Sequence, residues 1–280
     1  MIRGIGIIAA CGLIGAATVG CSDPESGSRA NSATETVYVT PSAPESSTVD
    51  SSTGATTGRG CPAPVVALDP GHNAVETNEF DPVTGVLMRD YPNGAEDRDA
   101  VDVATAVKTD LEASGYKVVI VKPTAASDVT YRERVTRAEK AGADIGVSIH
   151  TYTNDHRIFV QRVGLYRSGT GADGAPHTVT FEDAAVAKKS QKYAAAIASA
   201  RTGAEGREVS VTDNSFDGRA PLWGGNIPVI SLISDKVPWV YSEFGTAAGG
   251  GSTPIGAAGV ETYAQGLAAG IKDAVPNTCR

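Results

Sequence analysis

The chain has 280 residues and a formal net charge of −8. This charge argues against a nucleic-acid-binding protein, because such proteins carry basic stripes or patches. The length allows one large α/β domain or two small ones. Composition favours one domain, because residues 1–60 differ in composition from everything that follows them.

Residues 1–20 have the composition of a secretory signal peptide. Arg3 precedes an uncharged run rich in Ile, Ala and Gly, as in the n-region and h-region of such signals. The run is short for a membrane-spanning helix and its glycines weaken a permanent anchor, although an uncleaved anchor is an alternative.

The sequence Thr18-Val19-Gly20-Cys21 resembles a bacterial lipobox. We therefore expect export to the cell envelope and a lipid on Cys21 that holds the protein on the outer face of the membrane; ordinary cleavage and secretion is the alternative, because Thr18 is not the usual leucine.

Residues 21–60 are dominated by Ser, Thr, Ala, Gly, Pro and acidic residues. Too few large apolar residues are present to offset the entropy of ordering the chain. We predict a disordered stalk that gives a folded domain, residues 61–280, reach beyond the membrane; a linker without a specific role is the alternative.

Cys61 and Cys279 flank this domain, and in an oxidising compartment such a pair suggests a disulfide, with two free thiols as the alternative.

Within the folded domain, apolar runs and helical periodicity predict strands and helices that alternate along the chain. In chain order, we predict a strand at Val65–Leu68, a loop at Asn73–Asn93, a helix at Glu96–Ser114, a strand at Lys117–Val121, a helix at Tyr131–Ala141, strands at Ile145–Ile149 and Val163–Tyr166, a helix at Ala184–Ser199, a strand at Val237–Tyr241 and a helix at Gly259–Ala274. This alternation predicts an α/β fold of three layers, with a mainly parallel or mixed central sheet flanked by helices.

Two histidines each follow a predicted buried strand. His72 comes after Asp69-Pro70-Gly71, and His150 ends the strand Ile145–Ile149. The carboxyl ends of parallel strands meet at one edge of a sheet, where open α/β folds place their sites. Glu96 begins the next helix, where an acidic residue also interacts favourably with the helix dipole. Together His72, Glu96 and His150 form the ligand mixture that zinc uses when it keeps a fourth position for water.

A further acidic residue, Glu243, follows the predicted strand Val237–Tyr241. A buried carboxylate at a strand end is costly without a partner. Beside a metal-bound water it would accept a proton as the water attacks and pass that proton to a leaving amine. The sequence therefore predicts metal-assisted hydrolysis of an amide.

From about Pro64 to Val275 the chain resembles the catalytic domain of the type-3 N-acetylmuramoyl-L-alanine amidases, which are zinc hydrolases of peptidoglycan. Their opening Asp-Pro-Gly-His matches Asp69 to His72, their helix-starting glutamate matches Glu96, their Ser-Ile-His matches Ser148 to His150, and their late Glu-hydrophobic-Gly matches Glu243 to Gly245. The resemblance implies one zinc ion on His72, Glu96 and His150, Glu243 as the catalytic carboxylate, and cleavage of the bond between N-acetylmuramic acid and L-alanine.

The chain departs from the family pattern after both histidines. Asn73-Ala74-Val75 follow the first where glycines are usual, and Thr151-Tyr152 follow the second. The segment Thr151–Phe181 matches poorly, and we predict that its His156 and His177 are surface residues. Two other functions stay open: a peptidoglycan-binding protein of this fold without turnover, and a zinc peptidase acting on stem peptides. The sequence identifies no protein partner.

Overall fold

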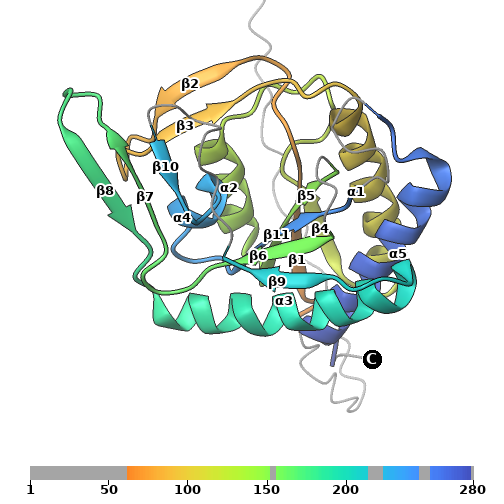
Figure 1. The fold of residues 1–280 in the computed structure, drawn as a ribbon. Helices are drawn as coiled ribbons and strands as arrows, with labels where there is room; N and C mark the ends of the chain where they lie inside the picture. Colours follow the sequence, from red (N-terminus) through yellow and green to blue (C-terminus); the bar gives the residue numbers. More distant parts are fainter. Residues whose placement is uncertain (1–61, 152–155, 214–222, 246–252, 279–280) are drawn as a thin grey trace, which may run out of the picture. The chain divides into compact units, whose positions relative to one another are not determined.

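In the computed structural model, a six-stranded mixed sheet runs through the described part of the chain, which comprises residues 62–151, 156–213, 223–245 and 253–278. The strands lie in the order β4 (Lys117–Ile120), β1 (Val65–Pro70), β5 (Ile145–His150), β11 (Trp239–Glu243), β6 (Arg157–Val160) and β9 (Ser210–Thr212). The first four strands are parallel, whereas β6 runs antiparallel to β11. β1, β5 and β11 therefore end side by side at one edge of the sheet (Figure 1).

Helices cover both faces of this sheet, which gives three layers. One face packs against α1 (Ala95–Ala113), α3 (Ala184–Glu205) and α5 (Gly256–Ala274), and the other against α2 (Tyr131–Ala141) and the short α4 (Val229–Ile233). The close contact of α3 with α5 needs a glycine, because a Cβ on Gly270 would lie 2.4 Å from the Cα of Ile197. The predicted three-layer α/β fold is confirmed.

Local chemistry explains where the helices begin and end. Thr130 accepts a hydrogen bond from the backbone N–H of Glu133, whose side chain in turn accepts one from the N–H of Thr130. This capping box starts α2 at the predicted residue. The C-caps Gly142 and Gly206 adopt left-handed φ values of 68° and 65°, which glycine adopts without steric cost. The predicted helix Ala184–Ser199 is therefore longer than expected and ends only before Gly206.

A β-hairpin replaces the loop that we predicted over Asn73–Asn93. Its strands are β2 (Thr77–Phe80) and β3 (Leu87–Asp90). Asp81 accepts hydrogen bonds from Thr84 in the turn, and Gly85 has a φ of 75°. Four-residue strands are too short to show a clear hydrophobic period, which is why the sequence pattern missed them. Arg132 of α2 fixes the hairpin by donating two hydrogen bonds of 2.7 Å to Asp81.

The predicted strand Val163–Tyr166 is also wrong, because Gly164 sits in a turn with a φ of 87°. A three-stranded antiparallel sheet begins after this turn. Its strands are β7 (Tyr166–Thr170), β8 (Pro176–Thr180) and β10 (Trp223–Gly225). This small sheet places Arg167 of β7 near the edge where the central parallel strands end.

The predicted signal peptide (1–20) and stalk (21–60), together with Cys21, Cys61 and Cys279, lie outside the described residues. The described residues all belong to one unit, Thr56–Arg280. Among them, no helix combines the length and the apolar character that crossing a membrane requires.

Candidate metal centre

Three side chains that could bind a metal meet at the carboxyl edge of the parallel strands. His72 follows β1, His150 is the last residue of β5, and Glu96 lies in the first turn of α1. All three are buried, and one ligand atom from each lies within 4.8 Å of the others. His72 Nε2 is 3.3 Å from Glu96 Oε2, and His150 Nδ1 is 2.9 Å from Glu96 Oε1. Residues 78 positions apart in the sequence therefore form one cluster, as the strand-end argument predicted.

The imidazole of His72 is held by a carboxylate on its far side. Its Nδ1 lies 3.1 Å from Asp90 Oδ1, which leaves Nε2 directed at Glu96. Asp90 in turn accepts a hydrogen bond of 2.9 Å from the fully buried Arg134 of α2. Burial lowers the pKa of His72, but hydrogen bonds to Asp90 and Glu96 outweigh it and raise the pKa to about 10. A carboxylate behind a histidine fixes the ring and its tautomer, as is usual for metal ligands.

The ring of His150 is enclosed on two sides. Tyr241 of β11 stacks on it at a centroid distance of 4.2 Å. Directly after β1, the strand adjacent to β5, a Cβ on Gly71 would lie 2.1 Å from His150 Cε1, so only glycine fits there. Within the described residues, the buried Nε2 of His150 makes no hydrogen bond. Packing therefore determines the orientation of this ring, with Nδ1 facing Glu96.

Glu96 is the shared acceptor of the cluster. Its Oε1 accepts a hydrogen bond of 3.0 Å from the backbone N–H of Thr151, and its Oε2 accepts one from Asn93 Nδ2. Burial opposes its ionisation, but hydrogen bonds from His150 and His72 hold its pKa well below the ordinary value. Glu96 is consequently a carboxylate in the folded chain, in an interior position where an anion requires a cationic partner.

The chemistry of this donor set fits a small divalent cation. Two imidazole nitrogens and one carboxylate are the ligands of many catalytic zinc sites. Ligands about 2.1 Å from one ion lie at most about 4.2 Å apart, so the observed spacing needs only a small adjustment of the side chains. A metal ion binds to the nitrogen and oxygen lone pairs of these side chains in place of the protons that they otherwise share.

Glu243 ends β11 beside His150. The register pairs Glu243 with His150 on adjacent parallel strands, so their side chains start from the same face of the sheet. The Glu243 side chain is 1% exposed. The strand register therefore places Glu243 next to the ligand cluster.

A buried arginine fixes the backbone at this strand end. Arg201 of α3 donates hydrogen bonds of 2.8 Å to Ser242 Oγ and 2.9 Å to the carbonyl of Glu243. It also pairs with Glu205, one helical turn further along α3. Tyr263 of α5 completes the support by donating a hydrogen bond of 2.8 Å to the carbonyl of Ser242.

Of the two histidines predicted to be on the surface, only His177 is there, with 47% of its side chain exposed. His156 is buried, and its Nδ1 contacts Glu205 while its ring packs edge-on against Phe244. The prediction failed because the partner that permits burial, Glu205, lies 49 positions later in the sequence. His156 therefore belongs to the network behind Glu243.

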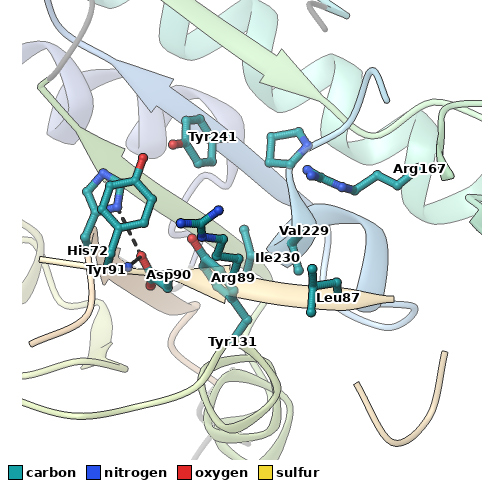
Figure 2. A pocket seen from close by; sticks show the side chains of 11 residues that line it. His72, Leu87, Arg89, Asp90, Tyr91, Tyr131, Arg167, Val229, Ile230 and Tyr241 are labelled. Carbon is teal, nitrogen blue, oxygen red and sulfur yellow. Dashed lines mark hydrogen bonds and ion pairs between the residues drawn. The ribbon is translucent and has the colours of Figure 1, made fainter. Parts of the chain in front are cut away.

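A pocket opens beside His72 and encloses about 590 Å³ of empty space, which includes some open solvent. Its walls come from the hairpin, from the start of α2, from β7 and from the segment around α4. Figure 2 shows His72 and Tyr91 at one end of the pocket and Arg167 at the other. The pocket connects directly with the face of His72 and has room for a small ligand.

Sequence reasoning missed five residues that support or line the site: Asp90, Asn93, Arg134, Arg201 and Tyr241. Only Arg134 had a usable signal. It lies four residues before Ala138 on the apolar stripe of a predicted helix, where a charged residue indicates a buried ion pair. The others act through contacts that only the fold creates.

Comparison with known proteins agrees with the fold. The family model Amidase_3, N-acetylmuramoyl-L-alanine amidase, matches residues 66–245. The amidase Ami1 of Mycobacterium smegmatis is 16% identical, with a TM-score of 0.51 over 75% of this chain and 96% of that chain. The apo form of Ami1 from Mycobacterium abscessus is 15% identical, with a TM-score of 0.51 over 75% of this chain and 98% of that chain. At such identities the likeness shows the fold alone. No curated protein sequence matches the chain.

Proposed function

The chain belongs to the N-acetylmuramoyl-L-alanine amidase family, and from this membership we propose that it is a zinc-dependent amidase of peptidoglycan. The bond it cuts is the amide between N-acetylmuramic acid and the first L-alanine of the stem peptide. The observation that carries this proposal is the buried convergence of His72, Glu96 and His150 at one edge of the sheet. Family members share the reaction, and the donor set supports the metal.

In this proposal, His72, Glu96 and His150 hold one zinc ion. The ion would polarise the scissile carbonyl and lower the pKa of a water from 15.7 to about 7. Asp90 and Arg134 keep Nε2 of His72 directed at the site. Tyr241 and Gly71 keep the ring of His150 in place. The ligands thus need little reorganisation when substrate binds.

Glu243 serves as the general base and then as the general acid. It accepts a proton from the attacking water and donates it to the amine of L-alanine as the amide bond breaks. Its strand position beside His150 supports this role. The contacts of Arg201 with Ser242 and with the Glu243 carbonyl limit movement of the backbone from which the carboxylate extends.

The reaction is tested by incubating the zinc-loaded chain with intact peptidoglycan and analysing the products by mass spectrometry. We expect free peptides that begin with L-alanine and glycan strands that keep their lactyl groups. Addition of a chelator is expected to abolish the release of peptides. Intact lactyl–alanine bonds together with cleaved stem peptides would indicate a peptidase, and binding without any cleavage would indicate a wall-binding protein.

We also propose that the enzyme is exported and held by a lipid on Cys21, with residues 21–60 as a stalk and Cys61 bonded to Cys279. The substrate lies outside the membrane, so an anchored enzyme needs such a tether to reach it. Fractionation of cells that express Cys21→Ser tests the anchor. We expect the variant to leave the membrane fraction; a variant that stays there would exclude lipidation at Cys21 as the anchor.

A further inference from the structure

The pocket beside the metal centre carries positive charge, although the chain as a whole is acidic. Arg89 of β3 and Arg167 of β7 both line it (Figure 2), whereas the net charge of the chain is −8. Asp90 is the one carboxylate among the residues that line this pocket in the described structure. Within the described residues, Asp90 pairs with His72 and Arg134, whereas Arg89 pairs only with Glu76.

Arg167 supplies a fixed charge at the end of the pocket away from His72 (Figure 2). It is 5% exposed, and its guanidinium donates hydrogen bonds of 3.2 Å to the carbonyl of Trp223 and 3.3 Å to that of Ile227. These main-chain contacts hold its orientation. The apolar side chains of Leu87, Val229 and Ile230 line the same pocket. A charge beside apolar walls acts more strongly on a ligand than one in water.

Arg89 is the arginine placed to contact a ligand directly. Its only ion pair within the described residues is an exposed contact of 3.5 Å with Glu76, and such surface pairs contribute little and exchange easily. In the same described residues, its buried Nε has no hydrogen-bond acceptor. The Arg89 side chain as a whole is 32% exposed, so a carboxylate in the pocket can contact the exposed part of its guanidinium, and bidentate binding by a guanidinium matches carboxylate geometry.

We propose that Arg89, assisted by the field of Arg167, binds a carboxylate of the peptide next to the scissile amide. The inference rests on the proposed function and defines its substrate class: the pocket selects stem peptides with a free acidic side group close to the first alanine. His72 lines the same pocket, so a ligand there lies alongside the metal centre. Replacing the carboxylate by a carboxamide removes the charge that both arginines attract.

The test uses two synthetic substrates, N-acetylmuramoyl-L-alanyl-D-glutamate and its α-carboxamide (D-isoglutamine) counterpart. In both compounds the γ-carboxyl group is blocked as a methylamide, so that they differ only in the free α-carboxylate. For the wild-type chain we expect a higher kcat/KM with the carboxylate substrate. Arg89→Met is expected to lower kcat/KM for the carboxylate substrate about 10- to 100-fold, as for a lost charged hydrogen bond, and to leave the amide substrate nearly unchanged. Arg89→Lys should retain part of the preference, because it keeps the charge but not the bidentate geometry.

Lys189→Met serves as the matched control, because it removes an exposed positive charge from α3, on the opposite face of the sheet. We expect this control to leave kcat/KM for both substrates unchanged. The inference would be overturned if Arg89→Met lowered kcat/KM equally for the two substrates. Equal kcat/KM values of the wild-type chain for both substrates would also overturn it.

Calorimetric binding of the same two compounds separates this inference from the proposed function. If the wild-type chain prefers the carboxylate compound and Arg89→Met does not, the pocket assignment holds even without hydrolysis, and only the amidase proposal fails. If hydrolysis occurs but neither binding nor kcat/KM depends on the carboxylate, the amidase proposal stands and the pocket assignment fails.

Discussion

The site has two halves, the side around His72 and the side around Glu243, and a different buried arginine supports each of them. Arg134, from α2 on one face of the sheet, binds the carboxylates of Asp69 and Asp90 behind His72. Arg201, from α3 on the other face, binds the main chain at Glu243. Both arginines are fully buried. The first therefore sets the charge around a proposed metal ligand, His72, whereas the second sets the position of a strand end.

In the proposed function, the Arg134 side supports metal binding and the Arg201 side supports proton transfer by Glu243. Loss of a charge partner on the Arg134 side should change metal affinity, because Asp90 controls the tautomer of His72. Loss of a backbone contact on the Arg201 side should change turnover, because proton transfer depends on sub-ångström placement of the carboxylate. Substitutions in each half therefore test the comparison directly.

The largest contrast is expected between His72→Ala and Glu243→Gln. His72→Ala removes a ligand and should abolish stoichiometric zinc binding together with hydrolysis. Glu243→Gln should keep the zinc and lower kcat by about 100- to 10,000-fold, the range for loss of a general acid–base group. Metal analysis of both purified variants, combined with product assays, checks this division. Equal metal loss in the two variants would refute it.

Arg134→Met tests the ligand half. It leaves Asp69 and Asp90 as buried carboxylates without their arginine, which should lower the free energy of unfolding by about 3 to 5 kcal/mol. If the variant folds, zinc affinity should fall about 10- to 100-fold, as for loss of support behind a ligand. Asp90→Asn, which changes the charge with less disturbance, should weaken zinc binding in the same direction. Unchanged affinity in both variants would disconnect Asp90 from the metal.

Arg201→Met tests the other half. Its loss leaves the carbonyl of Glu243 and the hydroxyl of Ser242 without their donor, at about 1 to 3 kcal/mol of stability. His156 remains as a partner of Glu205, so the loss is smaller than for Arg134. We expect a lower kcat, an unchanged KM and unchanged zinc content. Arg201→Lys should restore part of the kcat. Weaker zinc binding in Arg201→Met would show that the halves are not separate.

Thr130→Ala provides the smallest expected effect and a reference for pure destabilisation. It breaks the capping box of α2, and removal of an N-cap hydroxyl costs about 1 kcal/mol. Zinc affinity and kcat measured well below the melting temperature should match the wild-type values. A fall in kcat would mean that the position of α2 itself limits the reaction.

Much of the fold followed from the sequence, because its long helices and buried strands have clear periods. The convergence of His72, Glu96 and His150 also followed from the sequence, because the ends of neighbouring parallel strands meet at one edge of the sheet for any length of the intervening loops. The hairpin was missed because four-residue strands show no period, and β7 because Gly164 hides a turn inside an apolar run.

Apart from Arg134, the supporting residues could not be predicted, because their roles depend on contacts between distant segments. Arg201 reaches Glu243 across 42 positions, and His156 reaches Glu205 across 49. No local pattern distinguishes these residues from charged residues on a solvated helix face. Burial of charge is a property of the assembled layers, and only the fold reveals it.

The central claim, a metal centre built from His72, Glu96 and His150, is tested most directly by X-ray absorption spectroscopy of the zinc-loaded chain. We predict one zinc ion per chain, with two imidazole nitrogens and a carboxylate oxygen at about 2.0 to 2.2 Å. In His150→Ala, the spectrum should lose one imidazole. A zinc spectrum without imidazole ligands, or one that the His150 substitution leaves unchanged, would contradict the account.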